Sequence, residues 1–315
     1  MGLTSPARGA AIVALAGLFV AGALLGSGCA DKQPPLFSAD SAMVHVERQL
    51  AFGPRVPGSE ARDNATRYIA HTLERCGARV SIQSFDVDDP YSTGRIHLMN
   101  VIGSFGIDRS QRLMLASHYD SRPWADQEPD STRWNTPIPG AVDGALSTAI
   151  LLELARLVAA QPPSAIGLDL VFFDGEDHGK QSDTDHYLLG SRHFAANLEG
   201  YRPVAAILLD MVGGKETHAL REGVSNQQTA PLLDYVFGRA KALGLTYFQS
   251  EPGPSIYDDH IPLLQAGFDA IDLFGFDYPA WHTLADDISG VDPDKVAQTG
   301  ALLRDLVYDF RYQKP

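Results

Sequence analysis

The alternation of short apolar runs with helical patterns constrains the fold of this 315-residue chain more than any other feature. Three nearly continuous apolar runs are too short for helices and are typical of strands buried on both faces of a sheet. They lie at residues 112–117, 168–173 and 205–209. Amphipathic segments follow them, and 144–161 is the clearest helix. The pattern predicts one α/β domain, with a mostly parallel mixed sheet covered by helices on both faces.

The first 28 residues have the features of an export signal. Arg8 precedes an apolar stretch at 9–25, which is short for a membrane helix and suits a signal-peptide core. Small residues then lead to Cys29, and "LLGSGC" resembles a bacterial lipobox, whose cysteine carries the lipid. An ordinary signal peptide or an uncleaved anchor is the alternative. The expected parts are a lipoprotein-type signal peptide at 1–28, a Pro-containing tether at 29–40 and a folded domain at 41–315.

The net charge and the cysteine content limit the binding partners and the cellular location that we expect for the protein. The net charge is −14, without a basic segment, which argues against nucleic acid as a partner. Cys76 is the only cysteine besides Cys29, so a lipidated Cys29 leaves the domain without an internal disulfide. We expect export to a bacterial cell envelope, on the periplasmic or outer side, with membrane contact through the lipid anchor alone.

Polar side chains follow several of the predicted strands at the point where each strand ends. Ligands bind beyond the carboxyl ends of the strands in such sheets. The residues found there are His118, Asp120, Asp174, Glu176, Asp177 and Asp210, with Trp281 and His282 after the run at 270–276. Asp143 lies at the start of the clearest helix. Three carboxylates within 174–177 repel one another unless a positive charge lies among them.

Each of these residues has an ordinary explanation when taken alone. Asp143 can cap a helix N-terminus, and His118 can be a simple hydrogen-bonded histidine. Together, two histidines and several carboxylates form a nitrogen and oxygen ligand set that suits zinc. In the pair Glu176–Asp177, one carboxylate can bind the metal while the other carries protons. Asp120 can orient the imidazole of His118 through a hydrogen bond without binding the metal itself.

Five other polar residues are expected to lie in solvated loops. They are Asp126, Glu128, Asp130, His178 and His186. None of them is predicted to take part in the site.

Several motifs, in order along the chain, resemble the zinc exopeptidase family M28. They are "SHYDS", "GAVDGA", "FFDGEDHG", "YLLGSRHFA", "LLDMVG" and "WHT". The segment "DDHIPLLQAGFDAIDLFGFDYPAWHTLADD" is similar to the glutaminyl-peptide cyclotransferase branch, and the resemblance covers about residues 41–312.

The resemblance implies a role for each matching residue. It makes 41–315 a zinc-dependent catalytic domain in which Asp143, Asp177 and His282 are the zinc ligands. Glu176 is then the general acid/base, Asp258 the carboxylate bonded to it, and Trp281 a wall of the substrate pocket. His118 and Asp210 match ligands of a second zinc in the aminopeptidases of the family; the cyclases, which use one zinc, retain both residues without that role.

The chain also departs from the animal cyclases. Glu176–Asp177 replaces a Glu–Glu pair, so the shorter ligand can shift the metal. Ser117 and Thr148 stand where the animal enzymes have their disulfide, and a pocket tryptophan is absent from 179–186. These differences concern the shape of the pocket and the substrate preference more than metal binding.

Three functions are therefore compared. The first is a one-zinc cyclase that converts the N-terminal glutamine of peptides or proteins to pyroglutamate with release of ammonia. The second is a two-zinc aminopeptidase, for which all five ligands are present. The third is a non-enzymatic binding domain, which is disfavoured because such domains tend to lose ligands or the general base.

Overall fold

A computed structural model describes residues 1–5, 34–92 and 94–314. The chain divides into two units, Met1–Gln33 and Pro34–Pro315, and the second unit holds the fold. Almost all of the predicted signal peptide and Cys29 lie outside the described residues, so these assignments stay predictions. No helix in the described part of the chain has the length and hydropathy of a membrane span.

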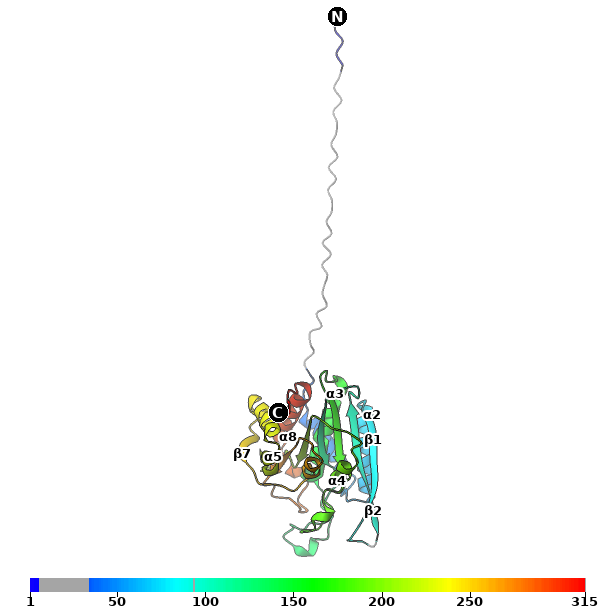
Figure 1. Ribbon diagram of the computed structural model, residues 1–315, viewed down its shortest axis with the longest axis vertical. Coiled ribbons are helices and arrows are strands. Elements are labelled where there is room, and N and C mark those ends of the chain that lie inside the picture. The colour runs from blue at the N-terminus through cyan, green and yellow to red at the C-terminus, as the bar shows by residue number, and fades with distance from the viewer. Residues whose placement is uncertain (6–33, 93, 315) are drawn as a thin grey trace. The chain divides into compact units, whose positions relative to one another are not determined.

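An eight-stranded mixed sheet forms the centre of the domain, as the apolar runs predicted. Its order is β1-β2-β4-β3-β5-β8-β6-β7, and Figure 1 shows β1 and β2 at one edge with β7 at the other. The four neighbouring strands β4, β3, β5 and β8 run parallel. The bounds are β1 Arg79–Asp88, β2 Arg95–Phe105, β3 Arg112–His118, β4 Gly167–Phe173, β5 Ala205–Asp210, β6 His218–Arg221, β7 Phe248–Pro252 and β8 Ala270–Phe276.

Helices cover both faces of the sheet because the parallel strands carry apolar side chains on both. In β3, Leu113 and Leu115 pack into the larger core, whereas Met114 and Ala116 face the smaller one. Helices on the larger core are α1 Ala39–Leu50, α2 Glu60–Arg75, α3 Ser147–Ala160, α6 Ala230–Ala242 and α8 Pro293–Tyr308. Helices on the smaller core are α4 Leu189–Ala196 and α7 His260–Gln265.

Three short elements were missed by the sequence analysis: β6, β7 and α5 Gly223–Gln228. The chain leaves the helical conformation between α5 and α6 at Thr229, with φ −135° and ψ 37°. The Thr229 hydroxyl donates to the Ala270 carbonyl of β8 at 2.7 Å. The break therefore ties this segment to the sheet.

The predicted tether at 29–40 is partly docked on the domain. Arg304 of α8 donates to the carbonyl oxygen of Pro35 at 2.7 Å, and the Ser38 backbone N–H donates to Glu153 of α3 at 3.1 Å. The Ser38 hydroxyl also caps α1. Residues 34–40 of the predicted tether therefore belong to the folded unit, and 29–33 lie outside the described residues.

Candidate metal centre and active site

The carboxyl ends of the parallel strands form a pocket of about 280 Å³. His118 ends β3, Asp174 follows β4 and Asp210 ends β5, so the fold brings these strand ends together as expected. The residues that line the pocket include Arg122, Asp143, Glu176, Asp177, Asp258, Trp281 and His282. Among the described residues, Arg122 is the one Arg or Lys that lines it. The pocket thus concentrates carboxylates around few cations.

The first group of possible metal ligands is Asp143, Asp177 and His282, whose ligand atoms all lie within 4.8 Å of one another. His282 Nε2 lies 3.5 Å from Asp177 Oδ1 and 3.8 Å from Asp143 Oδ2. Tetrahedral bonds of 2.0–2.2 Å require ligand atoms about 3.4 Å apart, so this spacing fits zinc. Asp177 Oδ2 is buried and has no hydrogen-bond partner within the described part of the chain, which leaves it free for a cation.

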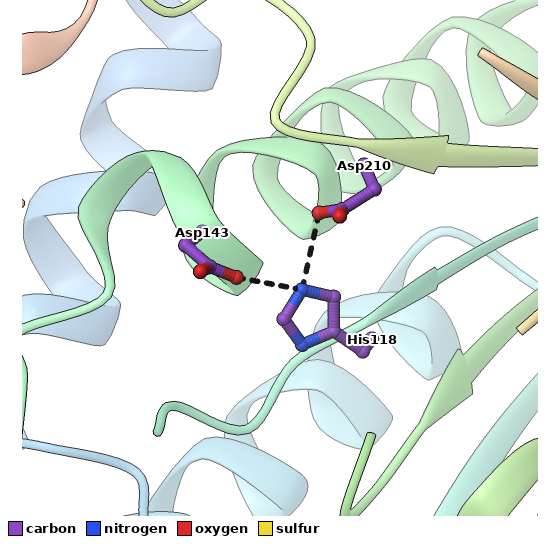
Figure 2. Close-up of side chains that lie close together, drawn as sticks. All are labelled: His118, Asp143 and Asp210. Atoms are coloured by element: carbon purple, nitrogen blue, oxygen red, sulfur yellow. Dashed lines mark hydrogen bonds and ion pairs between the residues drawn. The ribbon is translucent and has the colours of Figure 1, made fainter. Parts of the chain in front are cut away.

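The second group is His118, Asp143 and Asp210, and it shares Asp143 with the first. Figure 2 shows His118 Nε2 between the two carboxylates, 3.2 Å from Asp143 Oδ1 and 3.2 Å from Asp210 Oδ1. Burial alone would lower the pKa of His118, but contacts with Asp120, Asp143 and Asp210 raise it well above its usual value. His118 and the two carboxylates thus form a second possible ligand group.

Asp143 does not act as a simple helix cap, because α3 begins at Ser147 with Leu146 in the N-cap position. The backbone of Asp143 forms a turn instead. Its φ and ψ are −85° and 97°, and Gly144 follows at φ 97°. A side chain at Gly144 would collide with the carbonyl oxygen of Asp120, so glycine permits this turn. Asp286 accepts the backbone N–H groups of Val142 and Asp143 at 2.9 and 3.2 Å. The turn thus aims the Asp143 carboxylate at the pocket instead of at the helix N-terminus.

The Glu176–Asp177 pair is held from its backbone. Asp120 accepts the N–H of Glu176 and the N–H of Asp177, both at 3.2 Å. Its Oδ1 also lies 3.4 Å from His118 Nδ1, so Asp120 contacts the imidazole as expected. Asp120 therefore holds both His118 and the backbone of the Glu176–Asp177 pair. Burial, and then the charge of Asp177, raise the pKa of Glu176 well above its usual value. A carboxyl with a raised pKa is a candidate proton carrier.

Asp258 and Trp281 lie where the family resemblance places them, on the wall of the same pocket. Asp258 Oδ2 is buried, and it has no hydrogen-bond partner among the described residues, so the expected bond to Glu176 is not formed. Asp258 still acts on Glu176, because its charge helps to raise the pKa of that carboxyl. The Trp281 ring stacks on the His282 imidazole with centroids 3.8 Å apart and remains 42% exposed.

Asp126 was wrongly assigned to a solvated loop, and Arg122 was missed. The fully buried Arg122 donates to Asp177 Oδ1 at 2.6 Å and to both oxygens of Asp126, at 3.0 and 2.6 Å. Asp126 Oδ1 lies 3.3 Å from His282 Nδ1. Arg122 and Asp126 therefore connect two of the three possible ligands, Asp177 and His282, from the wall of the pocket. An arginine following "SHYDS" was the available signal.

Two further loop residues are also more structured than predicted. His178 is buried, with Nε2 3.1 Å from Asp89 Oδ1. Glu128 is half-buried and accepts the N–H of Leu284 at 3.0 Å, which fixes the segment after His282. Asp130 is exposed, as expected, and His186 is half-buried beside Asp183.

Ser117 and Thr148 lie side by side, in the positions where the animal enzymes are expected to carry their disulfide. Their hydroxyl oxygens are 3.1 Å apart, and Thr148 also donates to the His118 carbonyl at 2.9 Å. Hydrogen bonds therefore connect β3 to α3 at this point. Cys76 is the free cysteine in the described part of the chain.

The fold and the site define a class of protein: an α/β domain whose parallel strands carry a His/Asp donor set at their carboxyl ends, as metal-dependent enzymes do. The chain belongs to peptidase family M28, whose family model matches residues 100–307. It is 28% identical over 277 residues to the bovine (Bos taurus) glutaminyl-peptide cyclotransferase-like protein, covering 79% of this chain and 70% of the relative.

Two solved structures are similar over nearly the whole domain. One is Bacteroides thetaiotaomicron glutaminyl cyclase bound to N-acetylhistamine, with 35% identity and a TM-score of 0.84, covering 89% of this chain and 100% of that one. The other is a Zn-dependent exopeptidase from Parabacteroides distasonis, with 35% identity and a TM-score of 0.83, covering 88% of this chain and 100% of that one.

Proposed function

We propose that this protein is a zinc-dependent glutaminyl-peptide cyclotransferase, which converts N-terminal glutamine of peptides to pyroglutamate and releases ammonia. The observation that carries the proposal is the position of Glu176 beside the ligand group Asp143, Asp177 and His282, in a pocket walled by Trp281. Similarity to glutaminyl cyclases in both sequence and structure supports it.

Zinc fits the donor set better than a hard cation does. Imidazole nitrogen with carboxylate oxygen is a ligand set that zinc accepts, whereas magnesium and calcium prefer oxygen alone. Asp143, Asp177 and His282 would hold the ion. A zinc ion bound there would supply a positive charge that polarises the side-chain amide carbonyl of the glutamine.

The residues of the chain itself then divide the remaining work. Glu176 takes a proton from the attacking α-amine and delivers it to the departing amide nitrogen, so the new C–N bond replaces the old one and ammonia leaves. Its raised pKa suits both transfers. Trp281 packs against the substrate and limits the access of water, which would otherwise compete as the nucleophile.

A two-zinc aminopeptidase is the second candidate, and the group His118, Asp143 and Asp210 favours it. In that reaction Glu176 would activate a water held between two metal ions. Similarity to a Zn-dependent exopeptidase is compatible with this function.

One experiment separates the two candidates. The purified domain, starting at residue 34, is incubated with zinc and a peptide with N-terminal glutamine, while ammonia and peptide mass are followed. A cyclase releases one ammonia per peptide and yields a product lighter by that ammonia. Free glutamine with no ammonia would instead establish the aminopeptidase, and an unchanged peptide would reject both.

We further propose that Cys29 carries the lipid of an exported lipoprotein and that residues 29–33 connect it to the domain. The support is the lipobox-like "LLGSGC" after an apolar stretch. Globomycin, which blocks the lipoprotein signal peptidase, should cause an uncleaved precursor to accumulate, and Cys29→Ser should prevent lipid labelling. Normal cleavage at another residue would indicate an ordinary signal peptide.

A further inference from the structure

A second hollow adjoins the candidate active site and shares Trp281 with it. We call this hollow, of about 240 Å³, the annex. Its lining residues are Met211, Ile256, Phe274, Asp277, Tyr278 and Trp281. Ile256, Phe274 and Trp281 also line the active-site pocket, so the two spaces share a wall and open beside each other. The annex is apolar apart from Asp277.

The far walls of the annex are fixed by the fold. Tyr278 is buried and donates its hydroxyl to Asp286 at 2.8 Å. Met211 is buried at the end of β5 and adopts a left-handed backbone with φ 51°. A side chain at Gly275 of β8 would collide with the Met211 carbonyl, so glycine allows the backbone to pack closely there. These walls are in place without a ligand, which lowers the cost of binding one.

We propose that the annex binds the side chain of the second residue of the substrate peptide, and that it selects an apolar one. This inference rests on the proposed cyclase function. With the N-terminal glutamine in the active-site pocket, the next Cα lies about 3.8 Å further along the chain. Successive side chains of an extended peptide point to opposite sides, so the second side chain leaves the glutamine pocket. The shared wall at Trp281 then directs it into the annex.

Asp277 adds a charge preference at the rim. It is exposed and has a left-handed backbone with φ 67°. A carboxylate there repels an acidic second side chain and attracts a basic one. Because exposed charges are screened by water, this effect is smaller than the apolar one, about two- to fivefold.

The test compares four peptide amides that differ only in the second residue: Gln-Gly, Gln-Leu, Gln-Arg and Gln-Glu. The kcat/KM for Gln-Leu should exceed that for Gln-Gly by about tenfold or more, the size expected for burying a leucine side chain. Met211→Gln, which places a polar group in the wall at similar volume, should reduce the Leu/Gly ratio severalfold.

Asp277→Asn tests the charge at the rim, because asparagine tolerates the left-handed backbone. It should lower the Arg/Glu ratio of kcat/KM by two- to fivefold and leave the Leu/Gly ratio unchanged. Asp88→Asn is the matched control: it makes the same charge change at a side chain that is 96% exposed and lines neither hollow, and it should alter neither ratio.

Four peptides cyclised with equal kcat/KM within twofold would overturn the annex assignment alone. If none of the four peptides is cyclised, the proposed function is overturned, and the annex assignment with it. The two failures are therefore distinguishable in one assay.

Discussion

Replacing Asp126 by asparagine should weaken metal binding although Asp126 is not itself a candidate ligand. Its Oδ1 lies 3.0 Å from Arg122 Nε and 3.3 Å from His282 Nδ1, and its Oδ2 lies 2.6 Å from Arg122 Nη2. Burial alone would raise the pKa of Asp126, but the hydrogen bonds from His282 and Arg122 lower it far below its usual range. The Asp126 carboxylate thus keeps the proton of the His282 imidazole on Nδ1, which leaves the Nε2 of His282 available to the metal.

Neither orientation of an asparagine amide reproduces this arrangement. If the NH₂ group takes the position of Oδ2, it faces a donor on Arg122. If it takes the position of Oδ1, it faces Arg122 Nε and favours the His282 tautomer with the proton on Nε2. That nitrogen, which faces Asp143 and Asp177, then has no lone pair for a metal. Loss of such an outer contact typically reduces metal affinity about 10- to 100-fold. We expect a zinc dissociation constant raised by that factor in Asp126→Asn.

The assay is a competition titration of the metal-free protein with zinc against a chromophoric chelator, repeated with Co²⁺ to record its ligand-field spectrum. Asp130→Asn is the matched control, since it removes the same charge from the same loop at an exposed position. Thermal unfolding of the metal-free variants shows whether the fold is kept. A folded Asp126→Asn protein with wild-type zinc affinity and an unchanged cobalt spectrum would refute the orienting role.

Three further predictions follow from the site and its surroundings. Glu176→Gln should retain zinc but lose about 10²–10⁴-fold in kcat, because the proton carrier is gone; loss of metal would mean that Asp177 and Glu176 have exchanged roles. His118→Ala should leave about one zinc per chain by elemental analysis and part of the activity if this is a cyclase, whereas a two-zinc enzyme would lose one ion and nearly all turnover. Glu222 is buried, and burial alone would raise its pKa, but hydrogen bonds from His260 and Ser225 and the backbone lower it to about 2. A carboxyl with a lowered folded-state pKa stabilises the fold at pH values above its unfolded-state pKa. Glu222→Gln should therefore lower the free energy of unfolding in urea by about 1–3 kcal/mol at pH 7. This loss should become smaller as the pH falls from 4.5 toward 2.

The fold was predictable because its pattern is local. The apolar runs behind β3, β4 and β5 are long enough to be recognised without knowledge of their partners, and the polar residues after them mark the strand ends. By contrast, β6 and β7 are short, and their pairings with each other and with β8 bring together segments distant in sequence. Nothing within four or five residues distinguishes such strands from loops.

The sequence indicated the candidate ligands, but not the residues that position them. Asp126 follows Arg122 by four residues, whereas the His282 imidazole that it contacts is 156 positions away. Spacing in the sequence carries no signal for such a contact. The position of Asp143 depends on a contact of the same kind: Asp286, 143 positions along the chain, accepts the backbone N–H groups of Val142 and Asp143 and holds the turn that aims the Asp143 carboxylate at the pocket.

The aspartate at position 177, where animal cyclases are expected to have glutamate, shows how the surroundings can compensate for a shorter ligand. Asp120 holds the Asp177 backbone N–H, and Arg122 holds one carboxylate oxygen at 2.6 Å. Both contacts fix the side chain where its oxygen comes 3.5 Å from His282 Nε2, close to the separation of about 3.4 Å for tetrahedral zinc ligands. Asp177→Glu should therefore not improve the site. The longer side chain would have to give up Arg122 or move toward His282, and we expect a lower zinc affinity than in the wild type. Equal or tighter binding in the titration described above would show that Arg122 does not set the position of this ligand.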